Sequence, residues 1–183
     1  NKFTAAKKVR SSDSYSPGGK AGLRPDRATI VYANRVRECW PDIPVLIGGI
    51  EASLRRFAHY DYWSDSVRRS ILIDSRADLL VYGMGESQVL AIATMLQQGL
   101  SIREIRNVDG TCWVTGDTAD LPDNAMEVPA YEQVLKNKTD YAAAFKTQYL
   151  EQDPLRGRTI IQRHGERFLV QNKPALPLSS SEM

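Results

Sequence analysis

Two glycine turns flank the densest group of chemically capable side chains in the chain. Gly48-Gly49 follows the apolar run 45–47, and Gly83-Met84-Gly85 follows the apolar run 79–82. Glycine lets a backbone approach a ligand closely and leaves amide groups free to bind an anion. Buried strands that end in such turns form the ligand crevices of open α/β sheets. We therefore expect ligand or interface contacts between residues 44 and 86.

Neither turn completes a phosphate-binding motif. The first lacks the third glycine of a dinucleotide-binding sequence and the lysine of a phosphate loop. Glu51 would repel a phosphate at the start of the next helix, and Glu86 would complement a helix dipole. Glu86 could instead accept hydrogen bonds from a sugar hydroxyl. Each turn therefore has two interpretations, a tight strand-to-helix connection and a ligand contact.

Arginine, aromatic and carboxylate side chains alternate between residues 53 and 70. The members that we expect to contact a ligand or an interface are Arg55, Arg56, His59, Tyr60, Asp61, Tyr62, Trp63, Arg68 and Arg69, together with Gly48, Gly49, Glu51, Gly83, Gly85 and Glu86. Arginine binds anions and stacks on rings, and aromatic residues among arginines can hold single-stranded nucleic acid. The same side chains can pair with one another and dock the segment. We favour docking or an interface over substrate contact, and substrate contact over nucleic acid.

The chain offers no complete catalytic constellation. His59 has Asp61 and Asp65 nearby, and imidazole can act as a general base near neutral pH, but no nucleophile or metal partner accompanies it. Cys39 and Cys112 match no metal-ligand spacing and are typical of free thiols in a reduced compartment. We therefore predict no catalytic residue, no metal site and a cytoplasmic location.

Charge is distributed unevenly along the 183 residues. Residues 1–76 carry 14 Lys/Arg against 8 Asp/Glu, whereas the remainder carries 10 against 14. An anionic partner is therefore worth considering for the basic half. The longest apolar run, near 43–50, is far shorter than the ~20 residues of a membrane-spanning helix, so we expect no membrane partner.

The apolar patterning predicts an α/β fold with a parallel sheet. A helix over 25–40, strands at 45–47, 78–82 and 111–115, a helix over 86–98, a helix over 139–152 and a hairpin over 159–171 account for the pattern. His164 is interpreted as a residue of the hairpin turn. The expected segments are a basic extended arm (1–26), an α/β core (27–115), an acidic loop (116–130) and a helix-plus-hairpin extension (131–183).

Four stretches of sequence resemble the YgiQ-type radical-SAM proteins. They are RPDRATIVYANRVRE (24–38), IGGIEASLRRFAHYDYWSDSVRRSIL (47–72), ADLLVYGMGE (77–86) and QRHGERFLVQNKPALPLSSSEM (162–183). The resemblance implies a Rossmann-like domain, similar to cobalamin-binding domains and incomplete here, upstream of a catalytic barrel. In that family a CxxxCxxC motif of the barrel holds a [4Fe-4S] cluster that cleaves S-adenosylmethionine.

This sequence contains neither CxxxCxxC nor the DxHxxG motif of cobalamin binding. The resemblance therefore implies that the cluster and S-adenosylmethionine belong to the intact protein, and the missing DxHxxG motif speaks against cobalamin. We expect an accessory, noncatalytic domain whose partners are its own C-terminal barrel and an unknown substrate. Two alternatives stay open: a stand-alone module for a nucleotide or sugar phosphate at the glycine turns, and RNA binding by Arg55, Arg56, Tyr60, Trp63, Arg68 and Arg69.

Overall fold

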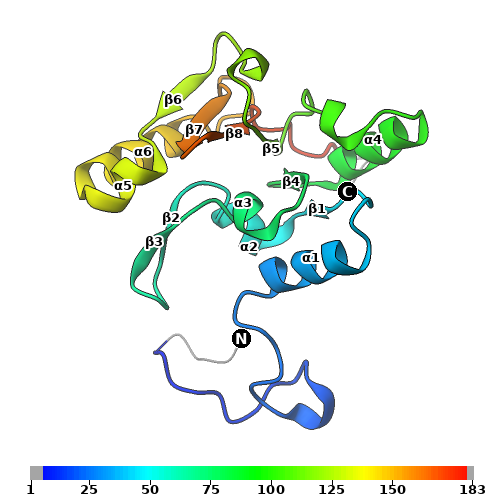
Figure 1. Ribbon diagram of the computed structural model, residues 1–183, viewed down its shortest axis with the longest axis vertical. Helices are drawn as coiled ribbons and strands as arrows, with labels where there is room; N and C mark the ends of the chain where they lie inside the picture. Colours follow the sequence, from blue (N-terminus) through cyan, green and yellow to red (C-terminus); the bar gives the residue numbers. More distant parts are fainter. Residues whose placement is uncertain (1–5, 181–183) are drawn as a thin grey trace.

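The computed structural model describes residues 6–180, and its centre is a six-stranded sheet (Figure 1). From edge to edge the strands are β1 (Leu46–Ile47), β4 (Leu79–Val81), β5 (Thr111–Thr115), β8 (Arg167–Gln171), β7 (Ile160–His164) and β6 (Met126–Val128). The spatial order differs from the chain order because the β7–β8 hairpin lies between β5 and β6. The strands of the expected extension and of the expected core therefore share one sheet.

The sheet is mixed. β1 is parallel to β4 and β6 is parallel to β7, whereas the other three neighbouring pairs are antiparallel. The predicted α/β class is confirmed, but the prediction of a parallel sheet is wrong for the sheet as a whole. The two-residue connection at Gly165 joins β7 to β8, and a connection this short can join only antiparallel strands. β8 also pairs antiparallel with β5, so the middle of the sheet is antiparallel.

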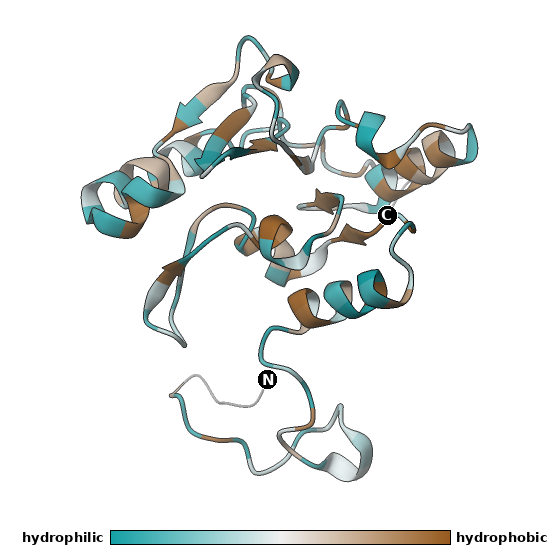
Figure 2. Ribbon diagram, viewed as in Figure 1, coloured by the Kyte–Doolittle hydropathy of each residue, from teal (hydrophilic) through white to brown (hydrophobic). Residues whose placement is uncertain are grey.

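Helices cover both faces of this sheet, since successive strand residues point to opposite sides. One apolar cluster joins Leu80, Cys112 and Leu169 to side chains of α1 (Ala28–Cys39), α2 (Gly49–Leu54), α3 (Ile71–Ser75), α5 (Tyr131–Lys136) and α6 (Lys138–Leu150). The opposite cluster joins Leu79, Val81 and Trp113 to side chains of α4 (Glu86–Gln97) and of the turn η2 (Ile102–Glu104). Figure 2 shows the apolar character of β1 and β4 between these layers.

Two expected segments differ from the structure. The acidic segment 116–130 is not a loop throughout, because it contains the turn η3 (Thr118–Asp120) and β6. β6 has no apolar run of its own and is stabilised by pairing with β7, with Met126 opposite Ile160. The helix expected at 139–152 begins one residue earlier, as α6, and α5 precedes it.

The basic arm is only partly described, since residues 1–5 lie outside the described range. From residue 6 onward the arm contains the turn η1 (Pro17–Gly19). Buried Asp13 accepts hydrogen bonds from the side chains of Arg24 and Ser16. The Arg24 guanidinium lowers the pKa of Asp13 to about 2. The arm is therefore folded back on itself by an ion pair.

Buried polar contacts attach the segment after α2 to the far half of the sheet. Gln162 on β7 accepts a hydrogen bond from the amide of Ala58 at 2.7 Å and donates one to the carbonyl of Pro129 at 3.0 Å. Gln171 on β8 accepts a hydrogen bond from Nε of Arg56. Both glutamines are fully buried, and a buried amide without its partner is costly. These contacts fix where the 56–58 backbone crosses the sheet.

Replacement of the buried arginine tests this anchoring. We expect Arg56→Met to lower the free energy of unfolding by about 2–4 kcal/mol, because Gln171 and the carbonyl of Ser53 lose their donor. Arg55→Met is the matched control, since Arg55 forms a partly exposed pair with Glu51 and its loss should cost less than about 1 kcal/mol. Urea unfolding of the 183-residue chain measures both. Equal losses for the two variants would contradict the anchoring role.

Candidate functional site

The two glycine turns lie side by side because the strands before them, β1 and β4, are parallel neighbours. Both turns pack closely on Val81 of β4. A Cβ atom at Gly85 would lie 2.7 Å from Cγ1 of Val81, and one at Gly48 would lie 3.3 Å from its carbonyl oxygen. Close packing against β4 is therefore sufficient reason for glycine at both positions. A ligand contact at either one stays a prediction.

The two carboxylates beside the turns lie at helix starts. Glu51 accepts a hydrogen bond from the hydroxyl of Thr29 at 2.8 Å and from its amide at 3.4 Å, within the first turn of α1. It also pairs with Arg55 at 3.0 Å. Glu86 is the first residue of α4, where its charge complements the helix dipole. Glu51 thus joins α1 to α2 and adds negative charge beside the first turn.

The segment after α2 forms an antiparallel hairpin, β2 (His59–Asp61) and β3 (Ser66–Arg68), that stands away from the main sheet (Figure 1). Buried Asp61 is its internal anchor. Asp61 pairs with Arg27 and accepts hydrogen bonds from the Ser64 hydroxyl and the Trp63 amide. These donors outweigh the effect of burial and lower the pKa of Asp61 to about 2. Asp61 therefore holds the hairpin turn against the start of α1 and is charged at neutral pH.

Aromatic rings gather at the end of this hairpin. Tyr60, Tyr62 and Trp63 are each 42–52% exposed, and the rings of Tyr62 and Trp63 meet edge to face at 5.6 Å. The Tyr60 hydroxyl donates a hydrogen bond to Asp65. An exposed aromatic group of this kind is typical of a contact surface.

The arginines of the segment have partners within the chain. Arg68 and Arg69 both pair with Asp74 of α3, and Arg55 pairs with Glu51. The guanidinium of buried Arg56 lies over the ring of Tyr82, 4.8 Å from its centroid. These contacts attach the segment to α3 and to the sheet, and a role of the same residues in an interface stays a prediction. Ligand contact by the same residues is not tested by this geometry.

His59 is held by its own backbone neighbourhood. Its Nδ1 donates a hydrogen bond to the carbonyl of Phe57 at 3.1 Å, and burial lowers the pKa of the imidazole. The ring is therefore neutral at physiological pH.

Among residues 6–180, no group of three or more His, Cys, Asp or Glu side chains could hold a metal ion. The same range contains no helix that is both long and apolar enough to cross a membrane.

Two adjoining hollows lie near the predicted site, and the larger one is lined by Gly83 and Met84 of the second glycine turn. Their volumes are about 430 Å³ and about 120 Å³, and they share Leu54, Arg56 and Gln152 as lining residues. The larger hollow lies between the Gly83-Met84 turn and the segment 174–177, and the smaller lies between residues 54–59 and α6. Arg56 is thus the one residue of the predicted site that reaches both hollows.

Large apolar side chains around these hollows are exposed. Five of them are between 54% and 73% exposed, and together they are called the apolar surface here: Leu54, Met84, Phe145, Tyr149 and Leu176. Sequence reasoning did not include them in the site. Tyr141, Phe145 and Tyr149 are four residues apart on α6 and share one helix face, but a face that packs inward and one that stays open give the same sequence pattern.

Comparison with known proteins gives one consistent result. The family described as Radical SAM N-terminal matches residues 1–183. A UPF0313 protein of Clostridium botulinum (strain Loch Maree / Type A3) is 56% identical over the whole chain, and a UPF0313 protein of Clostridium perfringens (strain SM101 / Type A) is 51% identical. In both cases the chain spans 28% of the relative's length. No solved structure matches the chain.

The packing of the second turn leads to a testable expectation. Gly85→Ala should lower the free energy of unfolding by about 1–3 kcal/mol, because the added methyl group meets buried Val81. Gly116→Ala is the control, since its nearest contact would be an ordinary 3.8 Å and its φ is not positive. Thermal or urea unfolding of both variants makes the comparison. If Gly85→Ala were as stable as the control, close packing would not explain this glycine.

Proposed function

The chain belongs to the Radical SAM N-terminal family, and from that premise we propose that it is the noncatalytic accessory domain of a radical-SAM iron–sulfur protein. Its role in this proposal is to supply an interface to the rest of that protein and, beside the interface, contacts to a substrate. The observation that carries the proposal is the apolar surface around the two hollows. The same proposal includes a Rossmann-like relationship, which the parallel β1–β4 pair supports. It also includes a cytoplasmic location, which the two free cysteines support.

The residues of this chain do not fit an iron–sulfur cluster. Such a cluster is held by several cysteine thiolates, and the chain has two cysteines. Cys112 is fully buried in β5, where burial raises the pKa of its thiol to about 12, whereas Cys39 is exposed at the end of α1. We therefore assign the cluster, and the S-adenosylmethionine that it cleaves, to the part of the intact protein outside these 183 residues.

The apolar surface supports an interface because an isolated domain gains nothing from exposing it. Contiguous apolar side chains on a protein surface mark sites where another surface binds. The segment 174–177 forms one wall of the larger hollow, and the longer relatives contain more than three times the length of this chain. The occupant that we propose is the remainder of the same polypeptide. The partners of Arg56 are neutral oxygen atoms and an aromatic ring, so its positive charge is not balanced by a carboxylate. A carbonyl or carboxylate group on the rest of the polypeptide would complement this charge.

The two alternatives from the sequence are less well supported. A phosphate at the glycine turns would lie near Glu51 and Glu86, which disfavours an anion. RNA binding by the 55–69 segment would need guanidinium groups that already pair with Glu51 and Asp74. Both remain predictions of lower rank than the interface.

A pair of charged substitutions tests the interface in the full-length protein. We expect Phe145→Asp with Tyr149→Asp to loosen docking, so that trypsin releases the N-terminal domain roughly tenfold faster or more, because two carboxylates would be buried without partners. Since both side chains are largely exposed within the domain, the 183-residue chain itself should lose little stability.

Leu90→Asp is the matched control for this experiment. Leu90 is 70% exposed on α4, outside both hollows. Its substitution should leave the rate of domain release within about twofold of the unmodified protein. Release at the control rate in the double variant would overturn the proposed interface.

A further inference from the structure

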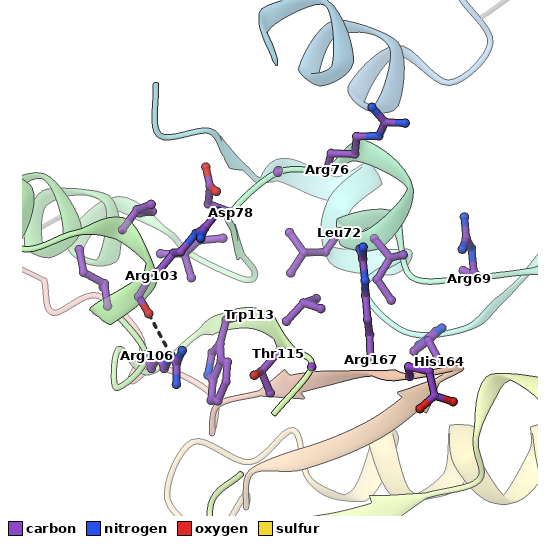
Figure 3. Close-up of a pocket in the computed structure, with 18 residues that line it drawn as sticks. Arg69, Leu72, Arg76, Asp78, Arg103, Arg106, Trp113, Thr115, His164 and Arg167 are labelled. Carbon is purple, nitrogen blue, oxygen red and sulfur yellow. Dashed lines mark hydrogen bonds between the residues drawn. The ribbon is translucent and has the colours of Figure 1, made fainter. Parts of the chain in front are cut away.

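A third cavity lies at the start of β4, whereas the larger hollow of the apolar surface lies after the end of this strand. Its volume is about 910 Å³, and it is bounded by α3, by the segment that contains η2, by the ends of β5 and β7 and by the start of β8. Figure 3 shows Arg103 and Arg106 on one side, Arg167 rising from β8 on the other, and Trp113 and Thr115 between them. These residues come from three separate parts of the sequence. Of the residues that line the cavity, Arg69 alone belongs to the site predicted from the sequence.

The lining of this cavity is strongly basic. It contains five arginines, Arg69, Arg76, Arg103, Arg106 and Arg167, against two carboxylates, Asp78 and Glu166. Asp78 is already occupied, since it pairs with Arg37 at 2.6 Å and accepts the amide of Val45 at 2.8 Å. Glu166 is 95% exposed at the side chain and lies 3.4 Å from Arg163. Neither carboxylate neutralises a lining arginine.

The guanidinium groups differ in how they are held. Arg69 pairs with Asp74, and Arg106 pairs with Asp120 while lying 5.0 Å from the centre of the Trp113 ring. Arg76, Arg103 and Arg167 make no ion pair with residues 6–180. Two of the arginines are thus fixed in place, and three have unused donors. That combination suits an anion with more than one negative charge, because guanidinium groups bind phosphate oxygens in a planar fork.

A buried polar group at the wall also lacks a partner. His164 is 6% exposed, and its Nε2 donates a hydrogen bond to Oε1 of Gln162 at 3.2 Å. Nδ1 of the same ring finds no partner in the described part of the chain. Burial, together with the charge of Arg69, lowers the pKa of His164 to about 4, so Nδ1 is an acceptor at neutral pH. Unpaired buried polar atoms are rare in folded proteins, so this wall holds a polar acceptor that the described residues leave unsatisfied.

We propose that this cavity binds a small phosphorylated molecule of nucleotide size. The unpaired arginines receive a diphosphate or larger phosphate group. The apolar part of the wall, which includes the partly exposed Ala77, Ile102 and Val114, receives a planar or apolar portion. A cavity of this volume matches those that enclose ligands of that size. The inference is independent of the proposed interface, because the cavity and the apolar surface share no residue.

Calorimetric titration of the 183-residue chain tests the inference with ADP, inorganic pyrophosphate and adenosine as probes. We expect ADP to bind saturably at one site, pyrophosphate to bind more weakly, and adenosine not to bind measurably. Arg103→Gln with Arg167→Gln should weaken ADP binding roughly tenfold or more, because two charge-assisted contacts are lost. Both side chains are exposed, so circular dichroism should show an unchanged fold.

The matched control is Arg35→Gln with Arg156→Gln, which removes the same charge from residues outside the cavity. It should bind ADP within about twofold of the unmodified chain. An equal loss in the control would show general electrostatic attraction and overturn the proposal. So would the absence of saturable binding by a folded chain up to about 10 mM ADP or pyrophosphate. Binding of a single-stranded oligouridylate without binding of ADP would assign the surface to nucleic acid and would also overturn it.

Discussion

The buried guanidinium of Arg56 is the contact on which the arrangement of this domain depends. It connects a segment next to β1, at one edge of the sheet, to Gln171 on β8, and it lies against the ring of Tyr82 after β4. Beside it, the amide of Ala58 bonds to Gln162 on β7. These polar contacts are sequestered from water, so a shift of the segment by one residue would leave several groups unpaired. The position of the β2–β3 hairpin and the shape of both hollows follow from this anchoring.

The molecule consequently presents two surfaces of different chemistry. Around Arg56, the exposed side chains are apolar and lie near the segment 174–177, which suits a protein surface of the same polypeptide. At the start of β4, arginines that flank α3, from η2 and the residues after it, and from β8 surround a cavity whose carboxylates are engaged elsewhere or exposed. Burial of apolar area would stabilise the binding of a protein surface at the first site, and charge would stabilise the binding of an anion at the second. The two surfaces can therefore be altered separately by substitution.

Local patterns in the sequence were enough to predict the glycine turns, α4 and the β7–β8 hairpin. The turns follow short apolar strands, and α4 shows apolar residues at helical spacing. Sheet order was not accessible, because insertion of the β7–β8 hairpin between β5 and β6 depends on contacts such as Cys112 with Gln171, far apart in the chain. The hairpin β2–β3 was missed because its strands have three residues each and contain no apolar run that would mark them as strands. Arg103 and Arg167 gave no signal, since the fold alone brings them to one cavity.

We propose that the rest of a radical-SAM protein covers the apolar surface. Hydrogen–deuterium exchange of the 183-residue chain and of the full-length protein measures this most directly, because it locates the amides that become protected. If the apolar surface is covered, exchange is slower in the full-length protein at α2, at α6 and at residues 152–155, with little change in α1. Unchanged exchange at α2 and α6, with new protection confined to other elements, would contradict it.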